Sequence, residues 1–199
     1  LGSAESKPEV IVFQGSGLKQ TGAVTADKLL FTGSGDFNLT GAVNDVTTIA
    51  AKLNGGSLEL TNANVKGMEI GSVENRNDGT VVDGLDTSGM GITSTVGKVT
   101  AAKEIVVKGE TKIVADEIDL GGNVKQTTKL TLEKYDETKD INLGSASADW
   151  KIKGSTYDEL VIGGETQSGD VKVADTDFAG NTTITTKGNV ELIGKNAPG

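Results

Sequence analysis

The chain has 199 residues, a formal net charge of −9 and a pI near 4.6, and it contains neither cysteine nor histidine. The acidic balance argues against nucleic acid or an anionic membrane as a partner, because neutralising phosphate groups takes Lys and Arg. The missing residue types exclude disulfides, thiol catalysis and His-based acid–base chemistry, and no run approaches the roughly 18 apolar residues of a membrane span.

Composition favours short strands and tight turns. Hydrophobic residues make up only 35% of the chain and aromatic residues 4%, whereas Gly occurs 28 times and Pro twice. Turns must therefore depend on Gly, Asn and Asp rather than on Pro, which is typical of a chain with many short strands. No stretch carries a 3.6-residue apolar period long enough for a helix, so the sequence predicts an all-β fold.

In chain order, residues 1–9 read as a processed or cloning-derived end, 10–195 as a single domain and 196–199 as a tail. Polar breaks at 72–80 and 133–140 are expected to be loops that project from the fold. Short apolar or β-branched runs along the rest of the chain are expected to be strands. These runs are 10–13, 28–32, 36–40, 46–53, 57–60, 67–71, 81–82, 91–93, 98–100, 104–108, 112–115, 117–120, 141–143, 150–152, 160–162, 171–173, 183–185 and 190–193.

Two interleaved series of aliphatic residues recur at a step near 20. The first series comprises Leu30, Ile49, Ile70, Ile92, Ile113, Leu132, Ile152, Val173 and Leu192. The second comprises Leu39, Leu60, Val82, Val99, Leu120, Ile141, Ile162 and Ile184. A period near 20 built from strand-like units is typical of a solenoid, in which each turn stacks on the last. The series predict about nine turns of parallel β-helix, a rod roughly 40–45 Å long at the usual strand spacing, with each series as one column inside it.

Several phrases of the sequence carry a resemblance to a known family. The phrases are 30–40 (Leu-Phe-Thr-Gly-Ser-Gly-Asp-Phe-Asn-Leu-Thr), 44–51, 56–63, 68–73, 141–144, 158–164 and 168–173. In order and spacing they resemble the repeat regions of filamentous-haemagglutinin-like exoproteins, adhesins exported by two-partner secretion. The resemblance implies a right-handed parallel β-helix that forms a stalk outside a Gram-negative-type cell and adheres to cells, surfaces or polysaccharide. This chain is far shorter than such adhesins and shows no recognisable secretion-signal domain, which leaves either a fragment or a short protein that uses the same fold.

Chemistry on a β-helix would need converging carboxylates, as in polysaccharide lyases and glycosidases. The candidates are Asp116, Glu117 and Asp119, or the pair Asp158 and Glu159. Strand alternation separates Asp116 from Glu117, and a solvated acidic face explains these residues as well, so no catalytic residue is expected.

Other polar residues are candidates for ion binding or for glycosylation. Asp83, Asp86, Asp136 and Asp140 are the candidates for weak calcium binding, but the spacing of known calcium loops is absent, so no metal or cofactor is expected. Asn38 and Asn181 each begin a glycosylation sequon, a pattern that is frequent by chance.

Partner contacts are expected at four residues in or beside the polar loops. They are Arg76, which is the only arginine, and the aromatic residues Tyr135, Trp150 and Tyr157. Loops on a rigid scaffold commonly carry binding, and exposed aromatics stack on sugars or partner proteins. For Trp150 the alternative is a cap over the apolar core.

Two functions remain open. The first is a structural and adhesive segment of a bacterial extracellular or surface exoprotein, in contact with neighbouring modules, a host surface or polysaccharide. The second is a subunit that stacks end to end into a filament or sheath, because no obvious polar cap covers the runs at 10–13 and 190–193 and open β-helix ends template addition.

Overall fold

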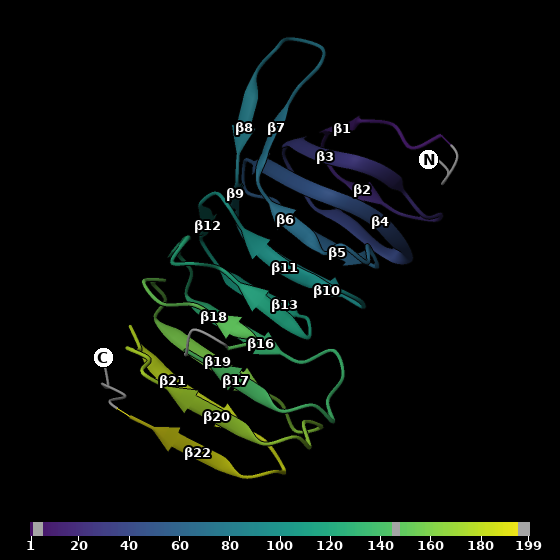
Figure 1. Ribbon diagram of the computed structural model, residues 1–199. Helices are drawn as coiled ribbons and strands as arrows, with labels where there is room; N and C mark the ends of the chain where they lie inside the picture. Colours follow the sequence, from purple (N-terminus) through teal and green to yellow (C-terminus); the bar gives the residue numbers. More distant parts are fainter. Residues whose placement is uncertain (2–5, 145–147, 195–199) are drawn as a thin grey trace.

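The computed structural model describes residues 1, 6–144 and 148–194, and every regular element within them is a β-strand. The expected tail at 196–199 and part of the expected N-terminal end segment, 2–5, lie outside the described residues. The strands form rungs that stack from the purple N-terminal end to the yellow C-terminal end (Figure 1). The prediction of an all-β solenoid with parallel strands is therefore confirmed.

The rungs contribute strands to two stacks, which a long strand joins into one sheet. The first stack runs, in order, through β2 (Leu18–Lys19), β4 (Phe37–Leu53), β5 (Ser57–Asn62), β10 (Gly89–Ser94), β13 (Glu110–Val114), β16 (Lys129–Glu133), β19 (Glu159–Gly163) and β21 (Asn181–Thr185). Each strand pairs in parallel with the next, so neighbouring rungs hydrogen-bond along the length of the stack.

The second stack contains the remaining parallel strands and the later part of β4. Its other strands are β1 (Val10–Gly15), β3 (Thr25–Gly33), β6 (Met68–Ile70), β9 (Leu85–Thr87), β11 (Lys98–Ala101), β12 (Ile105–Val107), β14 (Glu117–Asp119), β15 (Val124–Gln126), β17 (Ile141–Leu143), β18 (Trp150–Lys151), β20 (Val171–Ala174) and β22 (Val190–Ile193). β17 precedes β18 in the chain but lies between β18 and β20 in the stack. The sheet therefore gains one additional strand at this level.

Side chains alternate across each strand, so every second residue enters the interior. In the first stack one such column contains Phe37, Leu58, Met90, Thr111 and Leu130, which pair in register from rung to rung. None of them is more than 3% exposed. Aliphatic residues thus align as columns, as the sequence period predicts, and these columns form the main core.

The columns have two long steps. Leu58 pairs with Met90, 32 residues later, and Leu130 pairs with Leu160, 30 residues later. Elsewhere the step is shorter, as between Met90 and Thr111, which are 21 residues apart. An insertion accounts for each long step: the hairpin of β7 (Ser72–Glu74) and β8 (Val81–Asp83), and a segment of residues 134–149 that carries β17.

The two predicted aliphatic series are wrong as continuous columns, because each insertion adds about half a period. In the first series Ile49 and Ile70 pair within the second stack, but Ile92 and Ile113 pair within the first. The true partner of Ile92 in the preceding rung is Leu60, which the prediction assigned to the other series. The two series therefore exchange stacks at the hairpin and again at the second insertion.

Two further members of the predicted series lie outside the main core. Leu30 and Val82 are buried, but they belong to an outer cluster with Ala50 and Val73 on the far side of the second stack. The sequence predicts a projecting loop at 72–80; in the structure its first three residues are β7, which pairs antiparallel with β8 directly after it (Figure 1). The apolar base of this hairpin covers β3 and β4, so those strands are buried on both faces.

Buried asparagines stabilise the corner between the two stacks. Asn44 and Asn62 lie in register, and neither is more than 1% exposed. The Asn62 side chain accepts a hydrogen bond from the Val46 N–H and donates one to the Val46 carbonyl, both at 2.9 Å. The Asn44 amide donates to the carbonyls of Leu39 and Thr61, also at 2.9 Å. These bonds satisfy backbone groups where the chain leaves one stack for the other.

Glycine is required where neighbouring turns approach closely. Gly33 has a φ of 119° and stacks in register on Gly15, whose carbonyl oxygen would lie 2.1 Å from a Cβ at position 33. Any other residue would clash with the backbone of the preceding rung, which explains the Gly-rich turn after β3.

Candidate functional site

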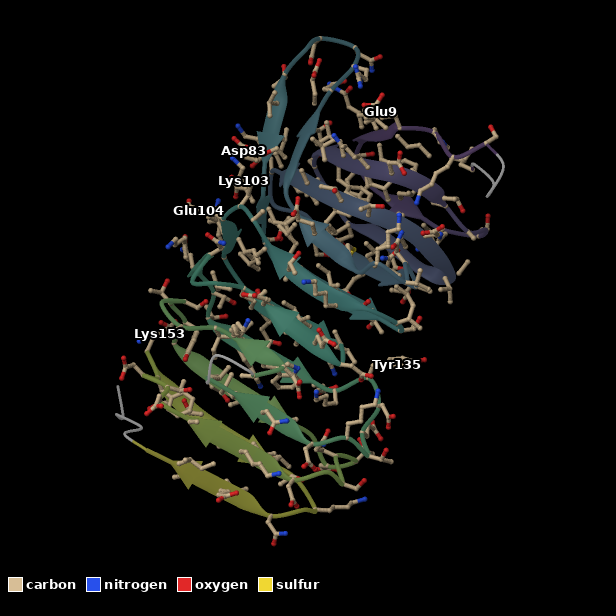
Figure 2. The ribbon with its side chains drawn as sticks, viewed as in Figure 1. Glu9, Asp83, Lys103, Glu104, Tyr135 and Lys153 are labelled. Atoms are coloured by element: carbon tan, nitrogen blue, oxygen red, sulfur yellow. The ribbon has the colours of Figure 1, made fainter. Side chains whose placement is uncertain are left out.

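The structure separates the four residues expected to contact partners. Arg76 lies in the hairpin loop and forms an ion pair with Glu9, so it joins the hairpin to the start of β1. Tyr135 is 47% exposed at the second insertion, well apart from Glu9 in Figure 2. Trp150 and Tyr157 are buried, so their rings are not on the surface. No single surface gathers these residues.

Trp150 is a core residue, and its burial supports the alternative interpretation as a cap. Its indole Nε1 donates to the Asp116 carbonyl at 3.3 Å. The Lys134 Nζ lies 5.7 Å from the ring centroid and also donates to the Asp116 carbonyl, at 2.6 Å. Only 2% of the Lys134 side chain is exposed, and it pairs with Asp149 at 3.2 Å. This buried cation, which gave no signal in the sequence, fixes the second insertion to the rod.

The candidate catalytic carboxylates serve as ion-pair partners. Burial raises the pKa of Asp116, but hydrogen bonds from Lys139 and from the Asp136 N–H outweigh this effect, so the pKa lies below its ordinary value of 3.8. Asp119 lies 3.7 Å from Lys151.

The other candidate carboxylates do not join this group. Glu159 lies 4.0 Å from Lys129, and Glu117 and Asp158 are exposed. Asp158 and Glu159 are consecutive residues of one rung, and Glu117 belongs to an earlier rung.

The aspartates considered for calcium are divided between lysines and a groove. Asp83 pairs with Lys103 at 3.3 Å, and Figure 2 shows the two side by side. Asp136 and Asp140 pair with Lys139 and Lys172 respectively. Within residues 1, 6–144 and 148–194, no group of three or more Asp or Glu side chains is arranged to hold a metal ion. Asp86 lines a groove beside the hairpin.

The last described rung, formed by β21 and β22, is the candidate functional site. Val190 and Leu192 stand in register with Val171 and Val173, which are completely buried one rung earlier. In β22 the same inward positions are 50% and 63% exposed. An apolar column that is closed one rung earlier thus opens at this one.

The open rung also presents a sheet edge. In the described part of the chain β22 pairs only with β20, and β21 only with β19. A parallel edge beside exposed aliphatic side chains offers main-chain hydrogen bonds and an apolar surface to a further strand. The site is suited to the addition of another solenoid rung.

Comparison of the chain with protein-family models, curated proteins and solved structures finds no match. No helix among the described residues is long and apolar enough to cross a membrane.

Proposed function

We propose that the chain is a structural and adhesive segment of a bacterial exoprotein, located outside the cell or on its outer surface, without chemistry of its own. The observation that carries this proposal is a continuous stack of apolar columns with two insertions anchored to its sides. Such a body is a rigid shaft that holds side elements at fixed positions. Each rung contacts only its neighbours, so length can be added without redesigning the core.

The proposed shaft is a right-handed parallel β-helix of about nine turns, each of about 20 residues, which is a repeat length in the solenoid range. Its membership in the filamentous-haemagglutinin-like family rests on the phrases at 30–40, 44–51 and 158–164. The absence of cysteine suits a chain that crosses membranes unfolded before it folds. Host surfaces and polysaccharides are the proposed adhesive partners.

A second function, end-to-end assembly into a filament or sheath, is favoured by the open terminal rung. The partner would be a second copy or a neighbouring β-helix module that continues the column above Val190 and Leu192. A head-to-tail contact of this kind does not close on itself and so produces open filaments.

Sedimentation and electron microscopy over a range of concentrations separate the two functions. End-to-end rods that disappear in Leu192→Glu would support the filament, because a charge at the open column opposes apolar stacking. Val65→Glu is the matched control, since Val65 is 82% exposed away from this rung and its replacement should leave assembly unchanged. Monomers at every concentration would count against the filament. The proposal of a structural shaft would then remain.

Adhesion is tested with beads coated with the purified chain and applied to cultured cells and immobilised polysaccharides. Retention above that of beads coated with an inert protein is expected on at least one surface. Equal retention on every surface would contradict the adhesive role.

A further inference from the structure

A polar groove lies between the hairpin and the rod. Its volume is about 450 Å³, which falls within the roughly 300–1,000 Å³ of small-molecule sites. One wall comes from the hairpin, with Asn75, Asp78 and Thr80. The other comes from the outer face of β1, β3, β4 and β9, where Gln14, Thr32, Lys52 and Asp86 follow one another in register along the stack.

Three charged side chains of this groove have no side-chain partner within the described residues, whereas Asp78 accepts a hydrogen bond from the Thr80 N–H at 2.9 Å. Lys52, Asp86 and Lys108 are exposed, and no ion pair or side-chain hydrogen bond within the described residues engages any of them. Several other lysines of the rod do pair with carboxylates, as Lys112 pairs with Glu133 at 2.9 Å. The groove thus keeps two ammonium groups and one carboxylate available to a ligand.

A hydroxyl at the same place lacks a partner as well. The Oγ1 atom of Thr32 is shielded from solvent and has no hydrogen bond in the described structure. Buried polar atoms are normally satisfied, so an unsatisfied one beside a groove needs an explanation. Because Thr32 lines the groove, a ligand hydroxyl bound there could pair with it.

The chemical groups that line the groove indicate which class of ligand it can bind. Two lysines call for an anion, but Asp86 and Asp78 on the same walls would repel a ligand that is negative all round, such as phosphate. Asp, Asn and Gln side chains accept and donate hydrogen bonds to hydroxyl groups. Val82 and Leu53, both largely buried, are the apolar residues in the lining. We propose that this groove binds a sugar acid, with its carboxylate at Lys52 and Lys108 and its hydroxyls at Asp86, Asn75 and Thr32.

The sugar acid has two sources, a free monosaccharide or a unit of an acidic polysaccharide. Lys108 also lines a second hollow farther along the rod, beside Gln126, Thr156 and Asp158. The two hollows have Lys108 in common, which suits an extended chain of uronate units that reaches from one to the other. Binding to an oligomer should therefore be tighter than binding to the monomer.

Calorimetric titration of the folded chain with galacturonate, trigalacturonate and neutral galactotriose tests the assignment. Trigalacturonate should bind most tightly, galacturonate more weakly and galactotriose not measurably. Lys52→Gln and Lys108→Gln should each weaken trigalacturonate binding about tenfold, the effect of losing one charge-assisted hydrogen bond. Lys153→Gln is the matched control, because Lys153 is exposed outside both hollows and its replacement should change nothing.

Three results would overturn the proposal: no binding of either uronate, equal binding of galactotriose, or binding that Lys52→Gln and Lys108→Gln leave unchanged. Equal affinity for monomer and trimer would assign the groove to the free sugar acid. The proposal goes beyond the shaft function and does not depend on it. A failure here leaves the solenoid, its open rung and the bead assay unaffected.

Discussion

The second stack is packed very differently at β3 and at its last described strand, β22. Near the N-terminus, Leu29 faces the interior and Leu30 faces the hairpin, and both are completely buried. In β22 all four residues are exposed, although Leu192 occupies the same kind of inward position as Leu29. The difference shows that burial in this fold depends on the next rung and the covering hairpin rather than on the strand's own sequence. Stability should therefore be shared between neighbours and weakest at the open end.

The largest expected effect comes from breaking an inner column at the well-packed end. Leu29→Ala leaves a cavity between Ile11 and Ile49 and should lower the free energy of unfolding by about 2–5 kcal/mol. Leu192→Ala, the same change at the open rung, should cost less than about 1 kcal/mol because its side chain is already in solvent. Urea unfolding measures both, and equal losses would contradict the proposed contrast.

A smaller loss is expected at the buried corner. Asn62→Ala leaves the N–H and carbonyl of Val46 without partners and should cost about 1–3 kcal/mol. Asn189 also makes a side-chain hydrogen bond, to Asp170 at 3.1 Å, but it is exposed beside the open rung. Its replacement by Ala should change stability by less than about 0.5 kcal/mol. A similar loss of unfolding free energy for both variants would contradict the stabilising role of the buried corner asparagine.

The outer cluster tests the contribution of the hairpin. Val73→Ala removes buried apolar surface between the hairpin and the second stack and should cost about 1.5 kcal/mol. Val81, which is 55% exposed on the same hairpin, provides the control. Hydrogen exchange should report faster opening of β1 and β3 in Val73→Ala but not in Val81→Ala. Unchanged exchange in both would mean that the hairpin does not support these strands.

The smallest expected effect is on the thermal stability of the protein at acidic pH. Hydrogen bonds from Lys172 and from the Asp170 N–H hold the pKa of Asp140 below its ordinary value of 3.8. A depressed folded-state pKa stabilises the protein fully above about pH 3.8, and this contribution is lost as the pH falls through the folded value. The melting temperature should therefore drop below pH 3.8, and Asp140→Asn should reduce that drop slightly. An acid profile that Asp140→Asn leaves unaltered would contradict this assignment.

The sequence predicts the fold class well because the solenoid period is a local pattern repeated many times. It does not predict which residues share a column. The hairpin insertion adds about half a period, so Ile92 pairs with Leu60 and not with Ile70, although the spacing between successive aliphatic residues stays near 20. Nor does it separate inward from outward burial at Leu30, whose covering residues Val73 and Val82 come from a later hairpin.

The sites were harder to predict than the fold. The sequence indicates a loop position for Trp150, because the composition gives no sign of the additional strand β17. In the structure β17 pairs with β18, the strand that contains Trp150. Lys134 is charged and buried, a placement that only the neighbouring Asp149 and Asp116 carbonyl explain. The groove joins residues far apart in the chain, from Gln14 to Lys108, and so has no motif.

Disulfide formation in this cysteine-free chain tests the central claim about register most directly. Glu59 and Gly91 are paired across the hairpin insertion, so their Cα atoms lie about one strand spacing apart, roughly 4.8 Å. A disulfide accepts that separation. Oxidation of Glu59→Cys/Gly91→Cys should give a cross-link, whereas Glu69→Cys/Gly91→Cys, the pairing that an unbroken 20-residue series would require, should remain reduced. Cross-linking of the second pair instead of the first would contradict the exchange of columns and the solenoid register built on it.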